Sequence, residues 1–229
     1  MKILFMAAGR GERYRKEGFT ISKPLIRYKD KAMIEHVIAQ FGGLVHLDDM
    51  IVVGTKEVCE HVEIRYSKGL LTVPVLQTQN GPGMSALLAG GFIDPFEEVI
   101  LVDSDSIVGD KAAESMVNSV GSSVLVRDHD GLTTAFSTVS TGIEDKVEDI
   151  QEKTGHSYTI CVGMYKFESW KKFVKSVCSL ASIRDTEIFL SAVMKDRLLK
   201  GDVVRAVSVT PEDWVNLGTP KDLTEAERT

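Results

Sequence analysis

The chain has 229 residues, of which 43% are hydrophobic and 26% are charged, and its formal net charge at pH 7 is −6. That length suits one globular domain with a large core, and the acidic balance, with no predicted helix carrying a cluster of Lys and Arg, excludes an electrostatic footprint for nucleic acid. The three cysteines (Cys59, Cys161 and Cys178) are far apart and form neither a CxxC metal motif nor an even disulfide set. Because no apolar run approaches the roughly 18 residues of a membrane span, we expect a cytoplasmic protein without a membrane or nucleic-acid partner.

In chain order, the first half of the sequence alternates short apolar runs with helical patterns. Strands are predicted at residues 3–6, 51–53, 73–76 and 99–102, and helices at 32–41, 56–66 and 84–90. The second half is less regular, with strands predicted at 133–140, 147–150, 158–167 and 203–207, and helices at 170–180 and 187–199. This alternation is typical of a mostly parallel sheet covered on both faces, so we expect an α/β fold whose second half extends the same sheet.

Three loops follow strands of this predicted sheet, at residues 7–26, 79–85 and 103–105. The carboxyl ends of parallel strands lie at one edge of a sheet, and ligands bind outside that edge. The three loops are therefore predicted to meet at one ligand site.

The first loop carries the sequence GRGER at residues 9–13 and, further on, Lys23 followed by a proline. Glycines allow successive backbone N–H groups to point at one anion, and an arginine such as Arg13 grips a phosphate with two hydrogen bonds. The loop lacks the GK[ST] of a Walker A motif, and Tyr14 stands where a dinucleotide fingerprint has its third glycine. The proline restrains Lys23 to an extended backbone and so directs its ammonium. A polar surface turn is the competing interpretation of this loop.

The third loop is acidic, with Asp103 and Asp105 directly after the apolar strand at 99–102. Carboxylates at alternate positions are a common way to hold Mg²⁺ together with the phosphates of a substrate. The competing interpretation is an Asx turn that caps a helix beginning near Asp110. The anion loop on the same edge favours the metal site.

The second loop, QTQNGPGMSA at residues 77–86, leads into a helix of small residues. Side-chain amides both donate and accept hydrogen bonds, so this turn has the chemistry to contact a nucleobase edge. A plain turn with Ser85 near the start of a helix explains the pattern equally well.

Further on, the pair Glu152-Lys153 is by itself typical of a surface ion pair.

The order of these motifs resembles that of the nucleotidyltransferases that make nucleotide sugars. Three later segments agree: VEDIQEK at 147–153, CVGMYKF at 161–167 and WVNLGTPKDL at 214–223 are similar to the V-x-x-I-x-E-K, N-x-G-x-Y-x-F and W-x-D-x-G-T-P-x-D-L elements of that family. The likeness covers nearly the whole chain. The stretch at 18–26 is closest to a subgroup associated with capsular polysaccharide synthesis.

The resemblance implies a GT-A-like, Rossmann-like three-layer α/β/α sandwich with a mainly parallel mixed sheet. It implies one nucleotidyltransferase domain over residues 1–229, with a nucleotide-binding half at about 1–130 and an acceptor-binding half at about 131–229. It also implies a Mg²⁺-dependent enzyme that condenses an NTP with a sugar 1-phosphate, or a similar small phosphomonoester, to give an NDP-sugar and pyrophosphate for surface polysaccharide synthesis.

The resemblance also assigns roles to individual residues. Arg13 would hold the β- and γ-phosphates, Lys23 would bridge the α-phosphate and the leaving pyrophosphate, and Asp105 would bind Mg²⁺, which makes these three the expected catalytic residues. The expected nucleotide contacts are Ala8, Gly9, Gly11, Arg13, Lys23, Gln79, Gly83, Ser85 and Asp103. The expected acceptor contacts are Glu152, Lys153, Gly163 and Glu187, with Lys153 on the acceptor phosphate, and the expected metal ligands are Asp105 and Asn216.

Two positions depart from the family pattern. Asn216 stands where many relatives have a second metal-binding Asp, and Cys161 replaces the usual Asn. Three alternatives therefore stay open: a cytidylyltransferase for a phosphocholine-like acceptor, a GT-A glycosyltransferase, and a non-catalytic nucleotide-binding protein. The turn with Gln79 favours a pyrimidine base, whereas the acceptor and a homo-oligomeric assembly stay open.

Overall fold

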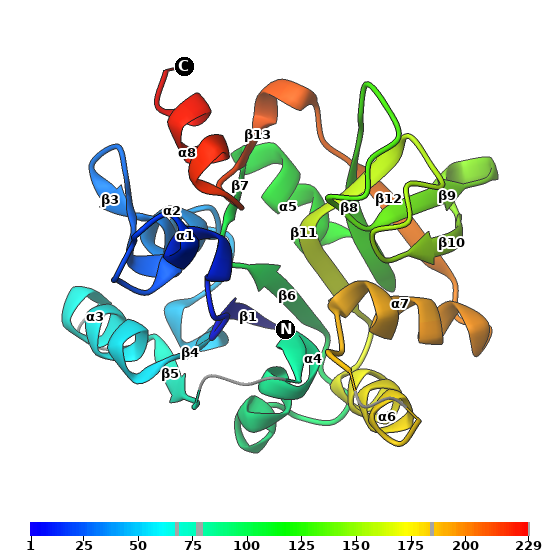
Figure 1. Ribbon diagram of the computed structural model, residues 1–229. Coiled ribbons are helices and arrows are strands. Elements are labelled where there is room, and N and C mark those ends of the chain that lie inside the picture. The colour runs from blue at the N-terminus through cyan, green and yellow to red at the C-terminus, as the bar shows by residue number, and fades with distance from the viewer. Residues whose placement is uncertain (67–68, 77–79, 184–185, 229) are drawn as a thin grey trace.

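The computed structural model describes residues 1–66, 69–76, 80–183 and 186–228, and it shows a central sheet with helices around it (Figure 1). The strands are β1 (Lys2–Ala7), β2 (Arg27–Tyr28), β3 (Lys31–Ala32), β4 (Met50–Gly54), β5 (Leu71–Pro74), β6 (Val99–Asp103), β7 (Ser106–Val108), β8 (Ser122–Asp128), β9 (Thr138–Thr141), β10 (Val147–Gln151), β11 (Thr159–Phe167), β12 (Val204–Ser208) and β13 (Trp214–Asn216). The α-helices are α1 (Glu12–Lys16), α2 (Met33–Ala39), α3 (Lys56–Tyr66), α4 (Gly81–Ala86), α5 (Asp110–Asn118), α6 (Trp170–Ala181), α7 (Leu190–Leu199) and α8 (Pro220–Ala226). Short 3-10 helices cover Lys23–Leu25, Leu47–Asp49, Leu87–Phe92, Ile143–Asp145 and Pro211–Asp213.

The main sheet runs in the order β10-β9-β11-β6-β1-β4-β5, and β8 joins it by pairing with β11 and β12. The four strands β6, β1, β4 and β5 are parallel to their neighbours in this group, and β12 is parallel to β8. Strand β11 is antiparallel to β6, β8 and β9, so the second half of the chain extends the sheet of the first half. The predicted α/β fold with a mixed sheet is confirmed.

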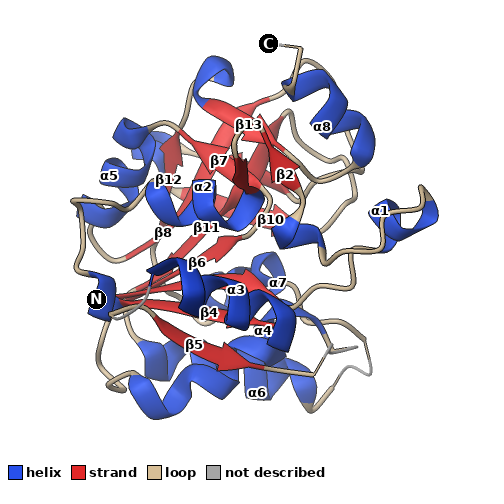
Figure 2. Cartoon of the chain, turned by 90° about the vertical axis from the view of Figure 1, so that its left-hand side faces the viewer, coloured by secondary structure: helices blue, strands red, loops and turns tan. Residues whose placement is uncertain are grey.

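Strand β1 shows why the first half folds as buried strands. Ile3 and Phe5 pack into the core beneath α2, α3 and α5, whereas Leu4 and Met6 pack into the core beneath α4, α6 and α7. Helices therefore cover both faces of the sheet (Figure 2). A strand buried on both faces is a continuous apolar run, which is the pattern that the sequence shows at residues 3–6.

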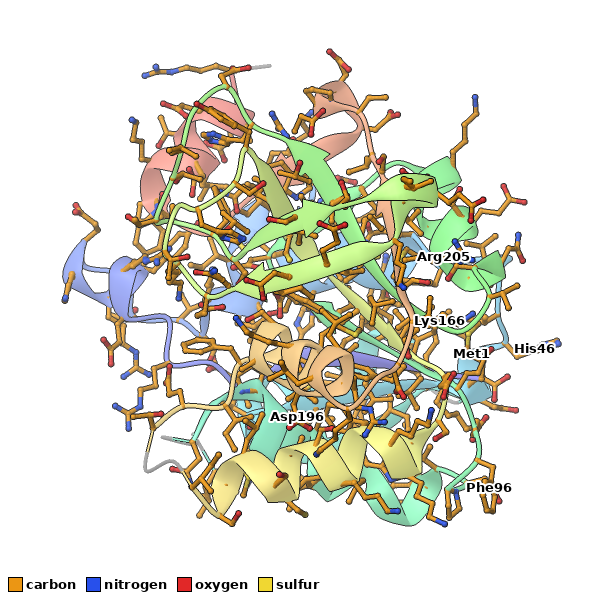
Figure 3. The ribbon with its side chains drawn as sticks, turned by 90° about the vertical axis from the view of Figure 1, so that its right-hand side faces the viewer. Met1, His46, Phe96, Lys166, Asp196 and Arg205 are labelled. Carbon is orange, nitrogen blue, oxygen red and sulfur yellow. The ribbon has the colours of Figure 1, made fainter. Side chains whose placement is uncertain are left out.

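Helix α7 lies between α6 and the β9–β10 strands, as Figure 3 shows from the side of these helices. The predicted helix at 187–199 begins only at Leu190, because the backbone of Ile188 is bonded elsewhere. The N–H of Ile188 donates to the carbonyl of Asn80, and the carbonyl of Ile188 accepts from the N–H of Gly83, both at 2.9 Å. The segment before α7 is therefore extended and packs against the start of α4.

Other boundaries also differ from the sequence prediction. Strand β5 lies two residues before the predicted range of 73–76, although the N–H of Val75 still donates to the carbonyl of Gly54 at 2.8 Å. Of the strand predicted at 133–140, only the last residues belong to β9, and residues 135–137 line the cleft described below. The apolar residues of this segment thus form a cleft wall instead of a strand.

Five strands were not predicted: the short antiparallel pair β2 and β3, and the strands β7, β8 and β13. Strand β8 has a short apolar run, residues 124–126, and it pairs with β11 and β12, which follow it in the sequence. Strands β7 and β13 form an antiparallel pair in which Ser106 is opposite Asn216. Next to this pair, the N–H of Leu217 donates to the carbonyl of Asp105 at 2.8 Å. This pairing brings the acidic turn and the C-terminal motif together.

In the described part of the chain, no helix combines the length and the apolar character that a membrane crossing requires.

A small third core joins α1 to the C-terminal segment, where Tyr14 packs with Leu217 and Leu223. The hydroxyl of Tyr14 donates to the carbonyls of Leu217 and Thr219, both at 2.9 Å. The helix that carries Arg13 is therefore tied to the turn between β13 and α8.

Candidate active site

A cleft of about 630 Å³ opens beside the carboxyl ends of β1 and β6. Its walls come from the loop after β1, the acidic turn after β6, the segment before β9, the turn after β10, the segment before α7 and the turn between β13 and α8. The predicted site residues that line it are Ala8, Gly9, Gly11, Arg13, Lys23, Ser85, Asp103, Asp105, Glu152, Lys153, Gly163, Glu187 and Asn216. The structure therefore brings almost all of the predicted residues to one cavity.

Two predicted nucleotide contacts do not join this group. Gln79 lies outside the described residues. Gly83 is buried but is not among the residues that line the cleft, because its N–H is bonded to Ile188 and a Cβ at its position would lie 2.8 Å from the Ile188 side chain. The absence of a side chain at Gly83 thus serves the packing of α4 against the segment before α7.

The glycine loop approaches Lys23 closely. Gly11 has a φ of 61°, and a Cβ there would lie 3.1 Å from the Cβ of Lys23. Glycine adopts that left-handed conformation without strain and leaves room for the lysine. Arg13 is the second residue of α1 and is exposed at the cleft, and within the described residues its guanidinium has no ion-pair or hydrogen-bond partner.

Lys23 is the centre of a group that joins three loops. Its ammonium forms an ion pair with Asp105, donates to the carbonyl of Gly218 at 3.1 Å, and lies 5.5 Å from the ring centroid of Tyr14. Burial, followed by the charge of Asp105, raises the pKa of Tyr14 well above its usual value, so its hydroxyl stays a donor. The cation in the loop after β1 is therefore positioned against the acidic turn.

Asp103 lies at the floor of the cleft against β11. Gly163 has a φ of 86°, and a Cβ there would lie 3.2 Å from the Cβ of Asp103 and 3.0 Å from that of Ser106. Desolvation, followed by the charge of Asp105, raises the pKa of Asp103 to about 8, while Lys23 and Lys153 oppose the shift. The Asp103 carboxyl group thus interacts electrostatically with the lysines on both sides of the cleft.

The residues predicted to hold a metal ion lie near one another. Asn216 is next to Leu217, and the N–H of Leu217 donates to the backbone carbonyl of Asp105. The side-chain Oδ1 of Asn216 accepts a hydrogen bond from the N–H of Gly218 at 3.0 Å. A carbonyl oxygen has a second lone pair, so this contact leaves Asn216 able to act as a ligand. Within the described ranges, no three His, Cys, Asp or Glu side chains form a metal-binding cluster. The donor set of carboxylate and amide oxygens fits a cation such as Mg²⁺, which needs one or two protein ligands besides phosphates and water.

The opposite wall of the cleft is built around Glu152 and Lys153. The Lys153 ammonium lies 3.1 Å from Glu152 Oε1 and 4.5 Å from the ring centroid of Phe189. Glu152 Oε2 accepts hydrogen bonds from the hydroxyls of Ser137 and Ser191. The pair that by sequence resembled a surface ion pair therefore faces a cavity.

Sequence reasoning missed several residues of this cleft. Ser137 and Ser191 carried no signal, because isolated serines are common in loops and at helix starts. Trp214 was seen only as part of a motif, yet its Nε1–H donates to Ser106 Oγ at 2.7 Å and its ring lies 5.1 Å from the guanidinium carbon of Arg127. An aromatic residue two positions before a metal-ligand candidate was the available clue.

The fold and the cleft define an α/β protein whose candidate site lies where open parallel sheets bind ligands. The sequence model of a family described as Nucleotidyl transferase matches residues 2–229, and the chain belongs to this family. A curated relative, the Bifunctional protein GlmU of Methanocaldococcus jannaschii, is 26% identical over 233 residues, which cover 100% of this chain and 54% of the relative. The chain thus spans about half the length of that relative.

Solved structures agree on the fold. A nucleoside-diphosphate-sugar pyrophosphorylase from Vibrio cholerae superposes with a TM-score of 0.82 at 15% identity, over 99% of this chain and 100% of that chain. An inositol-1-phosphate CTP transferase from T. maritima superposes with a TM-score of 0.76 at 16% identity, over 99% of this chain and 94% of that chain. At such low identities the superpositions establish the architecture, and the chemistry has to be argued from the cleft.

Proposed function

We propose that the protein is a Mg²⁺-dependent nucleotidyltransferase that joins an NTP to a sugar 1-phosphate, or a similar small phosphomonoester, and releases pyrophosphate. The observation that carries the proposal is the placement of two cationic groups in one cleft, Lys23 from the loop after β1 and Lys153 from the turn after β10, with Asp103 within electrostatic reach of both. Two phosphorylated ligands need two such groups, one for each. Family membership supports the reaction class.

The nucleotide phosphates are assigned to the glycine loop. Backbone N–H groups around Gly9 and Gly11 are suited to phosphate oxygens, and Arg13 has its donors available for the β- and γ-phosphates. Lys23 is assigned to the α-phosphate and the leaving pyrophosphate. Ala8, Ser85 and Asp103 complete the wall beside the nucleotide, and Gln79 keeps its proposed role at a pyrimidine base.

The acceptor is assigned to the opposite wall. Lys153 would hold its phosphate, and Glu152, Gly163 and Glu187 would contact the remainder. The reaction is an in-line attack of an acceptor phosphate oxygen on the α-phosphorus. That oxygen is already ionised near neutral pH, so the barrier is mainly repulsion between two anions, which Arg13, Lys23 and Lys153 would lower by charge and alignment.

Asp105 and Asn216 are the residues that would hold Mg²⁺. The cation would offset charge on the phosphate oxygens of the nucleotide. The ion pair of Asp105 with Lys23 supports this assignment, because the Asp105 carboxylate already faces positive charge in the cleft.

A phosphocholine-like acceptor is the second candidate, because aromatic rings line the cleft. Two of these rings are already covered: Lys153 lies over Phe189 and Arg127 over Trp214. A quaternary ammonium seeks an open aromatic face and is repelled by cations, so the cleft favours an acceptor that presents hydroxyl groups. The similarity to an inositol-1-phosphate CTP transferase extends the proposal to cyclic polyol phosphates.

The cellular role is also proposed. The likeness of residues 18–26 to the capsular subgroup supports a supply of activated sugar for surface polysaccharide. The cysteines Cys59, Cys161 and Cys178 are free, which fits a reducing cytoplasm.

The test is pyrophosphate release from each NTP with Mg²⁺ and a panel of sugar 1-phosphates, inositol 1-phosphate and phosphocholine. We expect release with one nucleotide and a hydroxyl-rich acceptor. Turnover of a nucleotide sugar without pyrophosphate from any pair would indicate a glycosyltransferase instead. Thermal stabilisation by an NTP without turnover would indicate a non-catalytic nucleotide-binding protein, for which the uncharged Asn216 is the best support.

A further inference from the structure

We propose that Ser137 and Ser191 are positioning residues that hold the carboxylate of Glu152 in the orientation that receives the acceptor. The inference rests on the proposed function, because it concerns the acceptor side of the same cleft. It assigns a role to two buried serines that no motif singled out.

Both hydroxyl groups donate to one oxygen of Glu152. Ser137 Oγ and Ser191 Oγ are bonded to Oε2, the latter at 2.5 Å, and the two serines are 9% and 2% exposed. Ser137 directly precedes β9, and Ser191 is the second residue of α7. The carboxylate is therefore held from two separate elements, the β9–β10 side and the helix that runs along it (Figure 3).

The two bonds orient the other oxygen. With Oε2 occupied by two donors, Oε1 is directed to Lys153, whose ammonium is 3.1 Å away, and to the cleft. Hydrogen bonds to a carboxylate are about twice as strong as neutral ones, and two from different elements prevent free rotation of the side chain. Glu152 thus presents one fixed oxygen to a ligand before the ligand arrives.

The backbone around each serine does not depend on its hydroxyl. The carbonyl of Ser137 accepts from the N–H of Cys161 at 2.8 Å, which fixes the chain entering β9. Helix α7 has Phe189 at its N-terminal boundary, and the carbonyl of Phe189 accepts from the N–H of Val193 at 3.2 Å. Substitution of either serine by alanine therefore removes a bond to Glu152 and leaves the backbone contacts in place.

The test compares Ser137→Ala, Ser191→Ala and the double variant with a matched control, Ser123→Ala. Ser123 is fully buried on β8, does not line the cleft, and its hydroxyl has no hydrogen-bond partner among the described residues. Each variant is assayed with the NTP and acceptor that the pyrophosphate screen identifies. We expect the KM for the acceptor to rise about tenfold for each cleft serine, with kcat within about twofold and the KM for the NTP unchanged. Ser123→Ala is expected to match the wild type.

A second arm uses Glu152→Ala as the background, because alanine has no side-chain oxygen that the two serines could hold. If the serines act through the carboxylate, adding Ser137→Ala or Ser191→Ala to this variant changes the acceptor KM no further. Equal further losses in both backgrounds would overturn the inference, as would serine variants that match Ser123→Ala while the wild type turns over. Absence of pyrophosphate from every pair with the wild type would overturn the proposed function and this inference with it.

Discussion

Replacement of Lys153 by methionine should separate the two halves of the cleft. The side chain is 40% exposed, its ammonium lies 3.1 Å from Glu152 Oε1, and it covers the ring of Phe189 at 4.5 Å. Lys153 has a φ of 51°, and methionine, also unbranched, meets the same backbone strain there. The substitution therefore removes the charge and keeps most of the apolar contact with Phe189.

The expected loss follows from this exposure. A preorganised charged contact at a reacting phosphate contributes about 2–4 kcal/mol to the transition state. Because water reaches Lys153, screening places the effect at the lower end, about 2 kcal/mol, or roughly a thirtyfold fall in kcat/KM for the acceptor. Binding of the NTP to the free protein should stay as in the wild type, since Lys153 lies on the opposite wall from the glycine loop.

The assay is initial-rate kinetics with each substrate varied, together with calorimetric titration of the NTP. Lys195→Met is the matched control, because Lys195 is 37% exposed, pairs with Asp149 at 2.9 Å, and does not line the cleft. We expect the control to keep the wild-type kinetics. Equal losses of NTP affinity and acceptor affinity in Lys153→Met would show that Lys153 is not an acceptor residue, and an unchanged kcat/KM would refute the assignment altogether.

Three further predictions concern the metal, acid stability and a buried hydroxyl. Asp105→Ala should abolish the activity that chelation with EDTA removes and added Mg²⁺ restores; an unchanged rate at limiting Mg²⁺ would exclude it as a ligand. Burial alone would raise the pKa of Asp202, but the hydrogen bonds from Arg197 and Lys172 together have the larger effect, so the pKa of Asp202 is below its usual value. The contribution of Asp202 to stability is therefore present above its unfolded pKa and is lost as the pH falls through its folded pKa. In urea titrations, Asp202→Asn should therefore cost about 3 kcal/mol near neutral pH, and this cost should shrink as the pH falls below the unfolded pKa of about 3.9; a constant difference would contradict this. Ser123→Ala should leave the melting temperature unchanged or raise it, because the buried hydroxyl lacks a partner among the described residues; a clear fall would reveal a bond to that hydroxyl.

Strands β1, β4 and β6 were predictable from the sequence because each of them is buried on both faces. Strand β6 is an apolar run that ends at Asp103, and helix α3 coincides with the predicted range. Parallel strands separated by helices also place their carboxyl ends together without any further information. The convergence of the three loops followed from that topology alone.

The second half resisted prediction because its strands pair across long sequence distances and with irregular register. The pairing of β11 with β8 shifts between Cys161 and Tyr165, around Gly163, where the strand passes close to Asp103. Residues 187–189 were predicted to begin the helix at 187–199, but the backbone of Ile188 is bonded to the start of α4. In both places a tertiary contact at the cleft overrides the local pattern.

The same distinction holds for the candidate site. The placement of Gly9, Gly11, Lys23 and Asp105 at one cleft was predicted, because phosphate and metal chemistry restrict the residue types that suit such ligands. The serines that hold Glu152 were not, because their role depends on distances between β9, β10 and α7 that no local pattern encodes.

The charges of the cleft explain a further difference between sequence and structure. By motif, Lys23 and Lys153 are phosphate ligands, yet in the structure each is paired with a carboxylate, Asp105 and Glu152 respectively. On the proposed function, a phosphate must therefore displace a protein anion from each lysine, and the anion that is left needs a new partner. Glu152 keeps the hydrogen bonds from Ser137 and Ser191 when the Lys153 ammonium binds a phosphate instead. The Asp105 carboxylate has Lys23 as its only charged partner among the described residues, so on the proposed function the exchange at Asp105 favours a nucleotide that arrives together with a divalent cation.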